Sequence, residues 1–235
     1  MLLVPGITSP AISWGFVAER ICAGFDVHVL DVRGRGLSEA GDLDYSLDAM
    51  AQDILALAEV LDFKDYVLLG HSMGARNAIR AVARSDSGRV ARVVLVDPPV
   101  SGPGRRAYPA KLDWYVDSIA LARKGCSAQD MKAFCPTWTD EQCALRAEWL
   151  HTCDETAVRV TFDGFHTDDI HVDLPQIKIP TRLVVAGGAP VIGADDIAEI
   201  RSLLPSIEVR TVEGAGHMIP WDDLEGFLGA VMDVG

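Results

Sequence analysis

Short apolar runs recur along the chain, and segments with helical periodicity separate most of them. The runs are rich in Val, Leu and Ile and do not alternate with polar residues, which is typical of strands buried on both faces. They predict strands over residues 2–4, 26–30, 65–69, 90–96, 181–186 and 207–212. Apolar residues at helical spacing predict helices over residues 13–23, 46–62, 73–85, 195–203 and 221–232. This order indicates an α/β fold with a mostly parallel sheet flanked by helices.

The alternation of strands and helices stops after Asp97. Residues 101–174 show helical patterns and no convincing strand; a Pro- and Gly-rich turn opens this segment and Leu174-Pro175 closes it. We therefore expect a core formed by residues 1–100 and 175–235 and a helical cap formed by residues 101–174. The cap is dense in aromatic side chains, which form either its own small core or the lining of a pocket: Tyr108, Trp114, Tyr115, Phe134, Trp138, Trp149, Phe162 and Phe165.

The composition narrows the class of protein. The 235 residues are 49% hydrophobic and 23% charged, which is enough apolar material for a folded core. The net charge is −13, so we expect no binding to nucleic acid or to an anionic membrane surface. No transmembrane stretch, secretion signal, CxxC pair or metal-ligand spacing is recognisable. We expect a cytoplasmic protein that acts on a small molecule without a metal or other cofactor, either as a monomer or as a homo-oligomer.

The segment Gly70–Gly74 (GHSMG) is a G-x-S-x-G motif between a predicted strand and a predicted helix. In this context the two glycines allow a tight turn, the nucleophile elbow, which presents a serine above the edge of the sheet. The serine then lies near the positive N-terminal end of the next helix. An ordinary glycine-rich turn is the weaker interpretation, and the GxxxxGK[ST] sequence of a phosphate-binding loop is missing. Ser72 is therefore the candidate nucleophile.

A serine needs a base to become nucleophilic, and His217 is the candidate. It lies in the segment 214–218 (GAGHM), after the last predicted strand. A base that follows the nucleophile late in the chain is one of the known orders of serine triads. The other histidines are weaker candidates because they fall within the elbow, within a strand or within the cap: His71, His28, His151, His166 and His171.

Two positions compete for the acid that orients His217. Asp97 directly follows the strand that comes after the elbow helix, and the end of that strand is expected beside the nucleophile. The loop after strand 181–186 is the other common position, but it contains no carboxylate before Asp195 and Asp196. We favour Asp97 and keep Asp195 and Asp196 as alternatives.

Two further loops at the carboxyl ends of strands complete the candidate site. The backbone N–H groups of Ile7, after the first strand, and Met73, after the nucleophile, are the predicted oxyanion hole. Gly6 permits the close approach that such a loop needs. The loop 31–38 (DVRGRGLS) either holds this face of the protein together or offers arginines to an anion, and we favour the structural role.

With these motifs in place, the chain resembles the α/β-hydrolase superfamily from end to end. More narrowly, it resembles the N-formylmaleamate deformylases of bacterial nicotinate degradation. In that family the serine of GHSMG, the aspartate of VLVDPP and the histidine of GAGHM form the triad, which implies Ser72, Asp97 and His217. The resembling stretches are 3–20 (LVPGITSPAISWGFVAER), 31–38 (DVRGRGLS), 70–76 (GHSMGAR), 94–109 (VLVDPPVSGPGRRAYP), 145–153 (LRAEWLHTC) and 214–224 (GAGHMIPWDDL).

The resemblance implies a serine hydrolase that cleaves N-formylmaleamate to maleamate and formate through a formyl-enzyme. A carboxylate substrate needs a local cation, and Arg105 and Arg106 at the start of the cap are the candidates. The family places two strands before the one at residues 2–4, so strand 26–30 is expected at an exposed edge of the sheet. Two other classes remain open: a hydrolase of this fold that cleaves an ester or a carbon–carbon bond, and a ligand-binding protein without catalysis.

Overall fold

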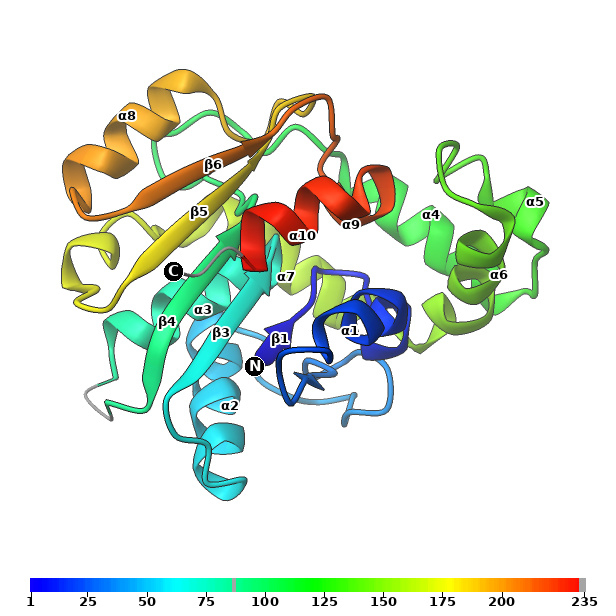
Figure 1. Ribbon diagram of the computed structural model, residues 1–235. Coiled ribbons are helices and arrows are strands. Elements are labelled where there is room, and N and C mark those ends of the chain that lie inside the picture. Colours follow the sequence, from blue (N-terminus) through cyan, green and yellow to red (C-terminus); the bar gives the residue numbers. More distant parts are fainter. Residues whose placement is uncertain (86–87, 233–235) are drawn as a thin grey trace.

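A computed structural model describes residues 1–85 and 88–232 of the chain. Its sheet has the strand order β2-β1-β3-β4-β5-β6 (Figure 1). Each neighbouring pair of strands is parallel, so the carboxyl ends of the strands meet at one edge of the sheet. The strands are β1 (Leu2–Val4), β2 (His28–Val29), β3 (Tyr66–His71), β4 (Val90–Val96), β5 (Thr181–Ala186) and β6 (Glu208–Val212).

The structure confirms the predicted α/β fold and most of the predicted strand bounds. β1, β4 and β5 begin and end where the apolar runs do, and β3 and β6 differ from the prediction by one or two residues. β2 is shorter than predicted. It pairs with β1 alone at the edge of the sheet, and its residues are only half-buried. The expected edge position of this strand is therefore confirmed, and its exposure explains why the run of apolar residues overstates its length.

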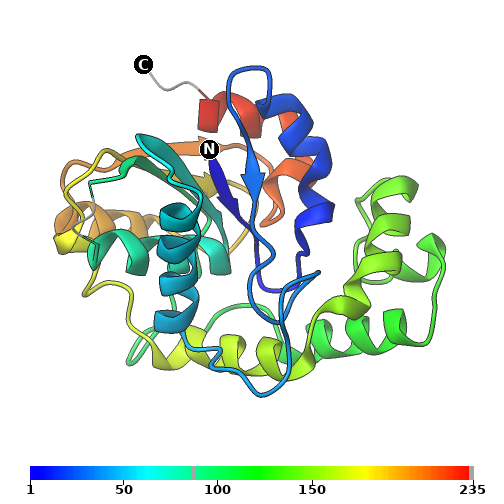
Figure 2. The ribbon, with the colours of Figure 1, turned by 90° about the horizontal axis from the view of Figure 1, so that it is seen from below.

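Helices cover both faces of the sheet. Figure 2 shows α1 and α10 on one face and α2 and α3 on the opposite face. None of the described helices is long and apolar enough to cross a membrane. The helices outside the segment between β4 and β5 are α1 (Gly15–Ile21), α2 (Leu47–Val60), α3 (Met73–Ala83), α8 (Ala194–Leu203), α9 (Ile219–Asp222) and α10 (Leu224–Met232), with the 3-10 turn η1 (Ala11–Trp14) before α1.

The predicted helices 13–23 and 221–232 are each divided in the structure. The first begins as η1 and continues as α1. The second breaks at Asp223, whose backbone leaves the helical conformation with φ −148° and ψ 88°. The Asp223 carboxylate accepts a hydrogen bond from the backbone N–H of Gly226 at 2.8 Å, which caps α10 as a new helix. Apolar periodicity does not register this break because the spacing of apolar residues continues across it.

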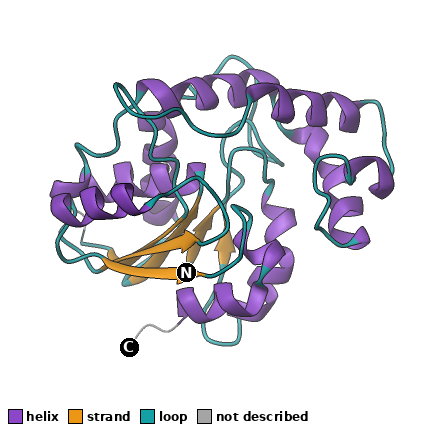
Figure 3. Cartoon of the chain, turned by 90° about the horizontal axis from the view of Figure 1, so that it is seen from above, coloured by secondary structure: helices purple, strands orange, loops and turns teal. Residues whose placement is uncertain are grey.

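Between β4 and β5 the described residues form helices and no strand. These elements are α4 (Leu112–Arg123), α5 (Ala128–Met131), α6 (Asp140–Trp149) and α7 (Glu155–Thr167), with the 3-10 turns η2 (Leu150–Thr152) and η3 (Leu174–Gln176). Figure 1 shows α4, α5 and α6 grouped to one side of the sheet, and Figure 3 shows the sheet with helices on both sides. The helical insertion expected after Asp97 is present. Its assignment as a cap of residues 101–174 on a core of residues 1–100 and 175–235 stays a prediction.

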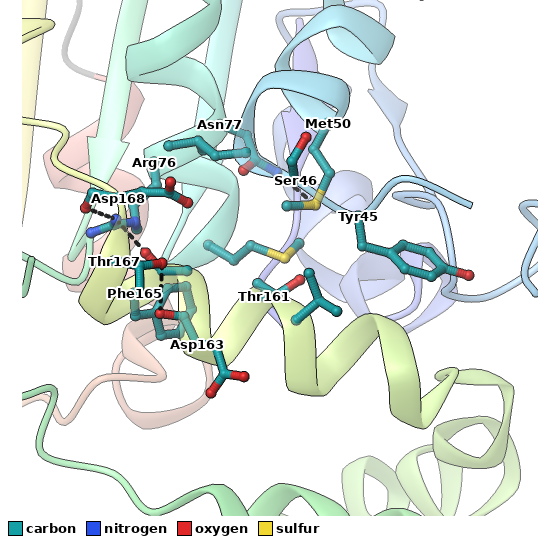
Figure 4. A pocket seen from close by; sticks show the side chains of 14 residues that line it. Tyr45, Ser46, Met50, Arg76, Asn77, Thr161, Asp163, Phe165, Thr167 and Asp168 are labelled. Carbon is teal, nitrogen blue, oxygen red and sulfur yellow. Dashed lines mark hydrogen bonds between the residues drawn. The ribbon is translucent and has the colours of Figure 1, made fainter. Parts of the chain in front are cut away.

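Helix α3 binds both ends of the inserted segment through Arg76. One terminal nitrogen of this buried guanidinium donates to the carbonyl oxygens of Pro99 and Ser101, at 2.7 and 3.1 Å. The other donates to those of Gly164 and Asp168, at 3.1 and 2.8 Å. Figure 4 shows Arg76 and Asp168 beside a cavity of about 280 Å³ that α2, α3 and α7 line. The helix that follows the elbow therefore holds the segment both where it leaves the sheet and where it returns.

Candidate active site

Ser72 alone joins β3 to α3. Its φ of 54° and ψ of −117° are a conformation that residues with a side chain rarely adopt. The turn leaves no room for a Cβ atom at the flanking glycines. Such an atom would lie 2.3 Å from the carbonyl oxygen of Gly74 if placed on Gly70, and 2.0 Å from that of Val4 if placed on Gly74. This is the geometry of the predicted nucleophile elbow, with the serine at the carboxyl edge of the sheet.

His217 lies between Ser72 and Asp97. Its Nε2 is 2.9 Å from Oγ of Ser72, and its Nδ1 is 2.6 Å from Oδ2 of Asp97. An ionised carboxylate only accepts hydrogen bonds, so Nδ1 carries the proton and Nε2 is free to accept from the serine hydroxyl. The structure thus brings together the three residues predicted as a triad, although Ser72 and His217 are 145 residues apart in the chain. This arrangement can convert a serine into a nucleophile.

Asp97 is fully buried and, like Ser72, has a strained backbone. In the part of the chain that the structure describes, the non-glycine residues with positive φ are Asp62, Asp65, Ser72 and Asp97. Two of these four belong to the candidate site, which is where such strain usually persists. Oδ1 of Asp97 accepts a hydrogen bond from the backbone N–H of Ala186 at 3.2 Å. β5 therefore fixes the carboxylate that follows β4.

The two alternative acids lie elsewhere. Asp195 and Asp196 are both in the first turn of α8. Asp195 is exposed. Asp196 accepts hydrogen bonds from the backbone N–H of Gly193 at 2.7 Å and from the guanidinium of Arg106 at 2.5 Å. The structure places Asp97, and neither of these two, against His217.

His71, inside the elbow, holds the loop that carries His217. Its Nε2 lies 2.9 Å from the backbone carbonyl oxygen of His217, so this nitrogen carries the proton and donates it. Burial, and after it the neighbouring His217, lowers the pKa of His71 to about 3. The ring is therefore neutral near neutral pH and acts on His217 as a hydrogen-bond donor.

The predicted oxyanion donors flank the nucleophile. Met73 is the first residue of α3, so its backbone N–H has no partner within the helix. Ile7 follows β1 and lines the same cavity as Ser72. Its carbonyl oxygen accepts a hydrogen bond from Nε of the buried Arg35 at 3.1 Å, which orients this loop. Both residues are at the carboxyl edge of the sheet, and their role in binding an oxyanion stays a prediction.

The loop 31–38 ties several parts of this edge together. Arg35 donates to the hydroxyl of Thr161 in α7 at 2.9 Å as well as to the loop after β1. Asp31 accepts from the backbone N–H groups of Ala11 and Leu37, at 2.6 and 3.0 Å. These contacts agree with the structural role that we favoured for this loop, because they join β1, the inserted segment and the loop itself.

A cavity of about 630 Å³ lies over Ser72 and His217. The elbow, the loops after β1, β5 and β6, and the inserted segment all contribute to its lining. Several aromatic residues of the inserted segment line the cavity and are also packed in the hydrophobic core, so both of the alternatives left open by the sequence apply. The aromatic residues of this lining are Tyr108, Trp114, Tyr115, Phe134 and Trp138.

Tyr108 reaches the candidate base. Its hydroxyl is 3.3 Å from Nε2 of His217 and 3.3 Å from the hydroxyl of Tyr115. Burial, followed by the neighbouring Tyr115, raises the pKa of Tyr108 well above its ordinary value, so the phenol keeps its proton. The sequence identifies Tyr108 only as one of the aromatic residues of the cap, because no local pattern brings residue 108 to residue 217.

The two arginines predicted to bind an anionic substrate are paired with carboxylates of the protein. Arg105 donates through both terminal nitrogens to Glu199, at 2.6 and 2.8 Å. Arg106 donates to Asp196 at 2.5 Å. Neither arginine lines the cavity over Ser72. This arrangement argues against the predicted role of both, because each positive charge is already paired with a carboxylate of the protein and neither side chain lines the cavity.

A different arginine, Arg146 of α6, lines the cavity. It is only 6% exposed, and it donates to the carbonyl and hydroxyl oxygens of Thr8 at 3.1 and 3.3 Å. The stretch 145–153 carries part of the family resemblance, but its sequence alone does not indicate a role for this arginine. Its partner Thr8 is 138 residues away in the chain, so periodicity gave no signal of the contact.

Residues 1–85 and 88–232 contain no group of three or more His, Cys, Asp or Glu side chains placed to hold a metal ion. All five cysteines are free thiols.

The site combines a strained serine between a strand and a helix, a histidine near the end of the chain, and a carboxylate after the next strand. This combination is typical of α/β hydrolases. The chain matches the Alpha/beta hydrolase family over residues 1–230 and belongs to it. It is 63% identical over 234 residues to the N-formylmaleamate deformylase of Pseudomonas putida, which covers 99% of this chain and 87% of that protein.

Two solved structures extend the comparison. The crystal structure of an N-formylmaleamic acid deformylase from Pseudomonas putida S16 is similar with a TM-score of 0.95 and 67% identity, covering 98% of this chain and 90% of that one. The structure of E-2-(acetamidomethylene)succinate hydrolase is similar with a TM-score of 0.79 at 24% identity, covering 99% and 89% of the two chains. The second likeness is one of fold.

Proposed function

We propose that this protein hydrolyses the N-formyl amide of N-formylmaleamate to maleamate and formate, with Ser72 as the nucleophile. The observation that carries the proposal is the 63% identity to an N-formylmaleamate deformylase over 99% of the chain. The contacts of Ser72, His217 and Asp97 support it, because they supply what acyl transfer to a serine needs. No observation favours ester or carbon–carbon bond cleavage, or binding without catalysis.

In the first half of the reaction, Oγ of Ser72 attacks the formyl carbon while Nε2 of His217 takes the hydroxyl proton. Asp97 stabilises the imidazolium that forms, because its carboxylate already accepts the hydrogen bond from Nδ1 at 2.6 Å. The carbonyl oxygen of the substrate becomes an oxyanion, which the backbone N–H groups of Ile7 and Met73 bind. The negative charge on the oxyanion thus develops next to hydrogen-bond donors that the backbone already holds in place.

The tetrahedral intermediate then collapses by breaking the bond between the formyl carbon and nitrogen. His217 returns its proton to the departing nitrogen, maleamate leaves, and a formyl ester remains on Ser72. The leaving nitrogen is that of a carboxamide, which bears developing charge better than a simple amine does. Water next attacks the ester while His217 takes a proton from it, and the second collapse releases formate and restores the serine hydroxyl.

The Tyr108 hydroxyl supports this cycle from the cavity side. It lies 3.3 Å from Nε2 of His217 and keeps its proton, so it can donate a hydrogen bond to the amide group that reacts there.

The substrate is a small anion, and we place the reaction within bacterial nicotinate degradation as the family resemblance implies. We also propose that the protein is cytoplasmic, which its free cysteines support. We further propose that it can associate into a homo-oligomer.

The proposed function is tested by incubating the purified protein with N-formylmaleamate and measuring both products. We expect formate and maleamate in equal amounts, formed at a rate that is proportional to enzyme concentration. A parallel reaction with p-nitrophenyl acetate reports whether the serine is reactive toward a simple ester. Hydrolysis of the ester without any formate from N-formylmaleamate would leave the triad intact but contradict the proposed substrate.

A further inference from the structure

Arg146 is a buried cation in the wall of the cavity over Ser72. Its guanidinium contacts two indole rings, with Cζ 5.5 Å from the ring centroids of both Trp114 and Trp138. Its terminal nitrogens donate to the carbonyl and hydroxyl oxygens of Thr8, at 3.1 and 3.3 Å. The two rings and the two hydrogen bonds to Thr8 together fix the orientation of the planar group.

This buried positive charge has no counterion among the residues that the structure describes. Arg146 forms no ion pair with a carboxylate of those residues, and its buried Nε has no hydrogen-bond partner among them. The other buried arginines have their charge or their N–H groups satisfied within the protein. Arg80 and Arg182 are paired with carboxylates, and Arg35 and Arg76, which form no ion pair with the described residues, each direct four hydrogen bonds to acceptors of the protein; none of these four arginines lines this cavity.

A buried guanidinium without an anion is costly, because desolvation of the charge is not repaid. Its unused N–H groups are matched by a planar anion that accepts two parallel hydrogen bonds, which is the geometry of a carboxylate. Lys111 also lines the cavity, but it is exposed to solvent, where its charge is already hydrated. Of these two cations in the cavity lining, Arg146 is therefore the one whose charge an anionic ligand would stabilise more.

The contact with Thr8 sets where this ligand would lie. Thr8 directly follows Ile7, whose backbone N–H is a proposed oxyanion donor, so the guanidinium is fixed to the loop that faces the reacting carbonyl. N-formylmaleamate has its formyl group at one end and its carboxylate at the other. We infer that Arg146 binds the carboxylate of the substrate and so selects anionic N-formyl amides over neutral ones. This inference rests on the proposed function, and it names the residue by which the site recognises its substrate.

Two consequences follow for specificity. The carboxylate remains on maleamate after the formyl group is transferred, so maleamate should bind at Arg146 and inhibit the enzyme competitively. The guanidinium also supplies a local positive charge within a protein of net charge −13, which otherwise repels a monoanion. Discrimination is largest in kcat/KM, because binding of the remote carboxylate helps to place the formyl carbon against Ser72.

The test compares N-formylmaleamate with its neutral analogue, in which a methyl group replaces the carboxylate, in wild type, Arg146→Gln and Arg146→Lys. We expect Arg146→Gln to lower kcat/KM for N-formylmaleamate by roughly 100-fold or more and for the neutral analogue by less than about fivefold. Arg146→Lys keeps the charge but loses the two parallel N–H donors of the guanidinium. Its kcat/KM for N-formylmaleamate should therefore fall by an intermediate factor, about tenfold. The control is Arg159→Gln, which removes the same charge from an exposed position on α7 and should leave both rates unchanged.

Equal losses on both substrates, or no loss on N-formylmaleamate, would overturn the inference, as would a charge-selective loss in Arg106→Gln or Lys111→Gln instead. Binding gives a readout that does not depend on turnover. Calorimetric titration of maleamate into Ser72→Ala and into Ser72→Ala/Arg146→Gln should show affinity at least about 30-fold weaker in the second protein. If wild type releases no formate, the proposed function fails, and this titration still decides the inference, since equal or absent affinity in both proteins contradicts it.

Discussion

Ser72 and Asp97 show how the backbone, more than the side chains, sets the reactive geometry. Each has a positive φ, and each follows directly from a buried strand of the parallel sheet. Such conformations cost of the order of 1–3 kcal/mol apiece and persist only where the surrounding packing enforces them. His217 bridges the two, with hydrogen bonds of 2.9 and 2.6 Å to their side chains. The chemistry therefore depends on a few residues that long-range packing holds.

The acid of the triad is tested by comparing Asp97→Asn with Asp195→Asn and Asp196→Asn. We expect Asp97→Asn to lower kcat roughly 10³–10⁴-fold, because an amide facing Nδ1 favours the wrong tautomer of His217. The other two variants should retain activity within a fewfold of wild type, since both carboxylates lie on α8. Steady-state formate release measures all three. A severe loss in Asp195→Asn or Asp196→Asn together with a mild one in Asp97→Asn would contradict the assignment.

Tyr108→Phe removes a hydroxyl that lies 3.3 Å from Nε2 of His217. We expect kcat/KM to fall about tenfold, the effect of losing one hydrogen bond in a desolvated site. The pKa of this phenol is raised well above its ordinary value, so the phenol does not titrate during catalysis and the alkaline side of the pH–rate profile should keep its shape. If the alkaline limb were present in wild type and lost in Tyr108→Phe, Tyr108 would be acting as an ionised group.

At the level of elements, the elbow depends on close approach between β3, α3 and the end of β1. Gly74→Ala places a Cβ atom 2.0 Å from the backbone oxygen of Val4, which cannot move as a side chain could. We expect a loss of about 1–3 kcal/mol in the free energy of unfolding, with loss of activity as the elbow shifts. Urea denaturation with a formate assay measures both effects.

Gly229→Ala is the matched control, because Gly229 lies inside α10 and a Cβ there meets nothing within 4 Å. That substitution should raise stability by about 0.5–1 kcal/mol, as expected for an alanine in a helix, and leave activity unchanged. Equal and small effects of Gly74→Ala and Gly229→Ala would show that the elbow does not need its second glycine.

The elements that the sequence predicts well are those with an unambiguous local signal. β4 and β5 are buried apolar runs with turns on either side, so their bounds are visible in the pattern. The break at Asp223 was missed because a cap interrupts the backbone without changing the apolar spacing. Ser72 and His217 lie in short motifs that can be recognised in the sequence. Arg146 and Tyr108, by contrast, are positioned by contacts with residues 138 and 109 positions away in the chain. Tertiary contacts of this kind leave no local trace in a single sequence.

On the scale of the whole molecule, buried polar groups join the inserted segment to the sheet. Arg76 of α3 donates to carbonyl oxygens at both ends of the segment, and Arg35 and Arg146 link the loop after β1 to α7 and α6. The loop after β1 and Arg146 both line the cavity over Ser72. A small number of arginine contacts therefore couple the positions of three parts of the molecule: the inserted segment, the loop after β1 and the elbow.

A buried neutral histidine makes stability depend on pH in a predictable direction. The folded-state pKa of His71 is about 3, below the ordinary value of about 6.5, so between these values the unfolded chain binds a proton that the folded one excludes. Stability should thus be fully present above about pH 6.5 and be lost as the pH falls toward 3, with a slope from this group of up to about 1.4 kcal/mol per pH unit.

Urea unfolding of wild type and His71→Gln between pH 4.5 and 7.5 measures this contribution. Gln keeps an N–H donor for the carbonyl of His217 but has no group that titrates, so the variant should show a shallower loss of stability on acidification. Burial also lowers the pKa of His171, so some dependence of the same sign should remain in the variant. Identical slopes in the two proteins would contradict the assignment of a neutral buried His71.

The central claim is that formate comes from N-formylmaleamate by attack of Ser72, and parallel assays of wild type and Ser72→Ala test it most directly. We predict equimolar formate and maleamate from wild type, and a rate lower by roughly 10⁶-fold in the folded Ser72→Ala protein. Rapid quenching of the wild-type reaction should also yield a formyl ester on the peptide that contains Ser72. Undiminished formate release by Ser72→Ala, or none by wild type, would contradict the account.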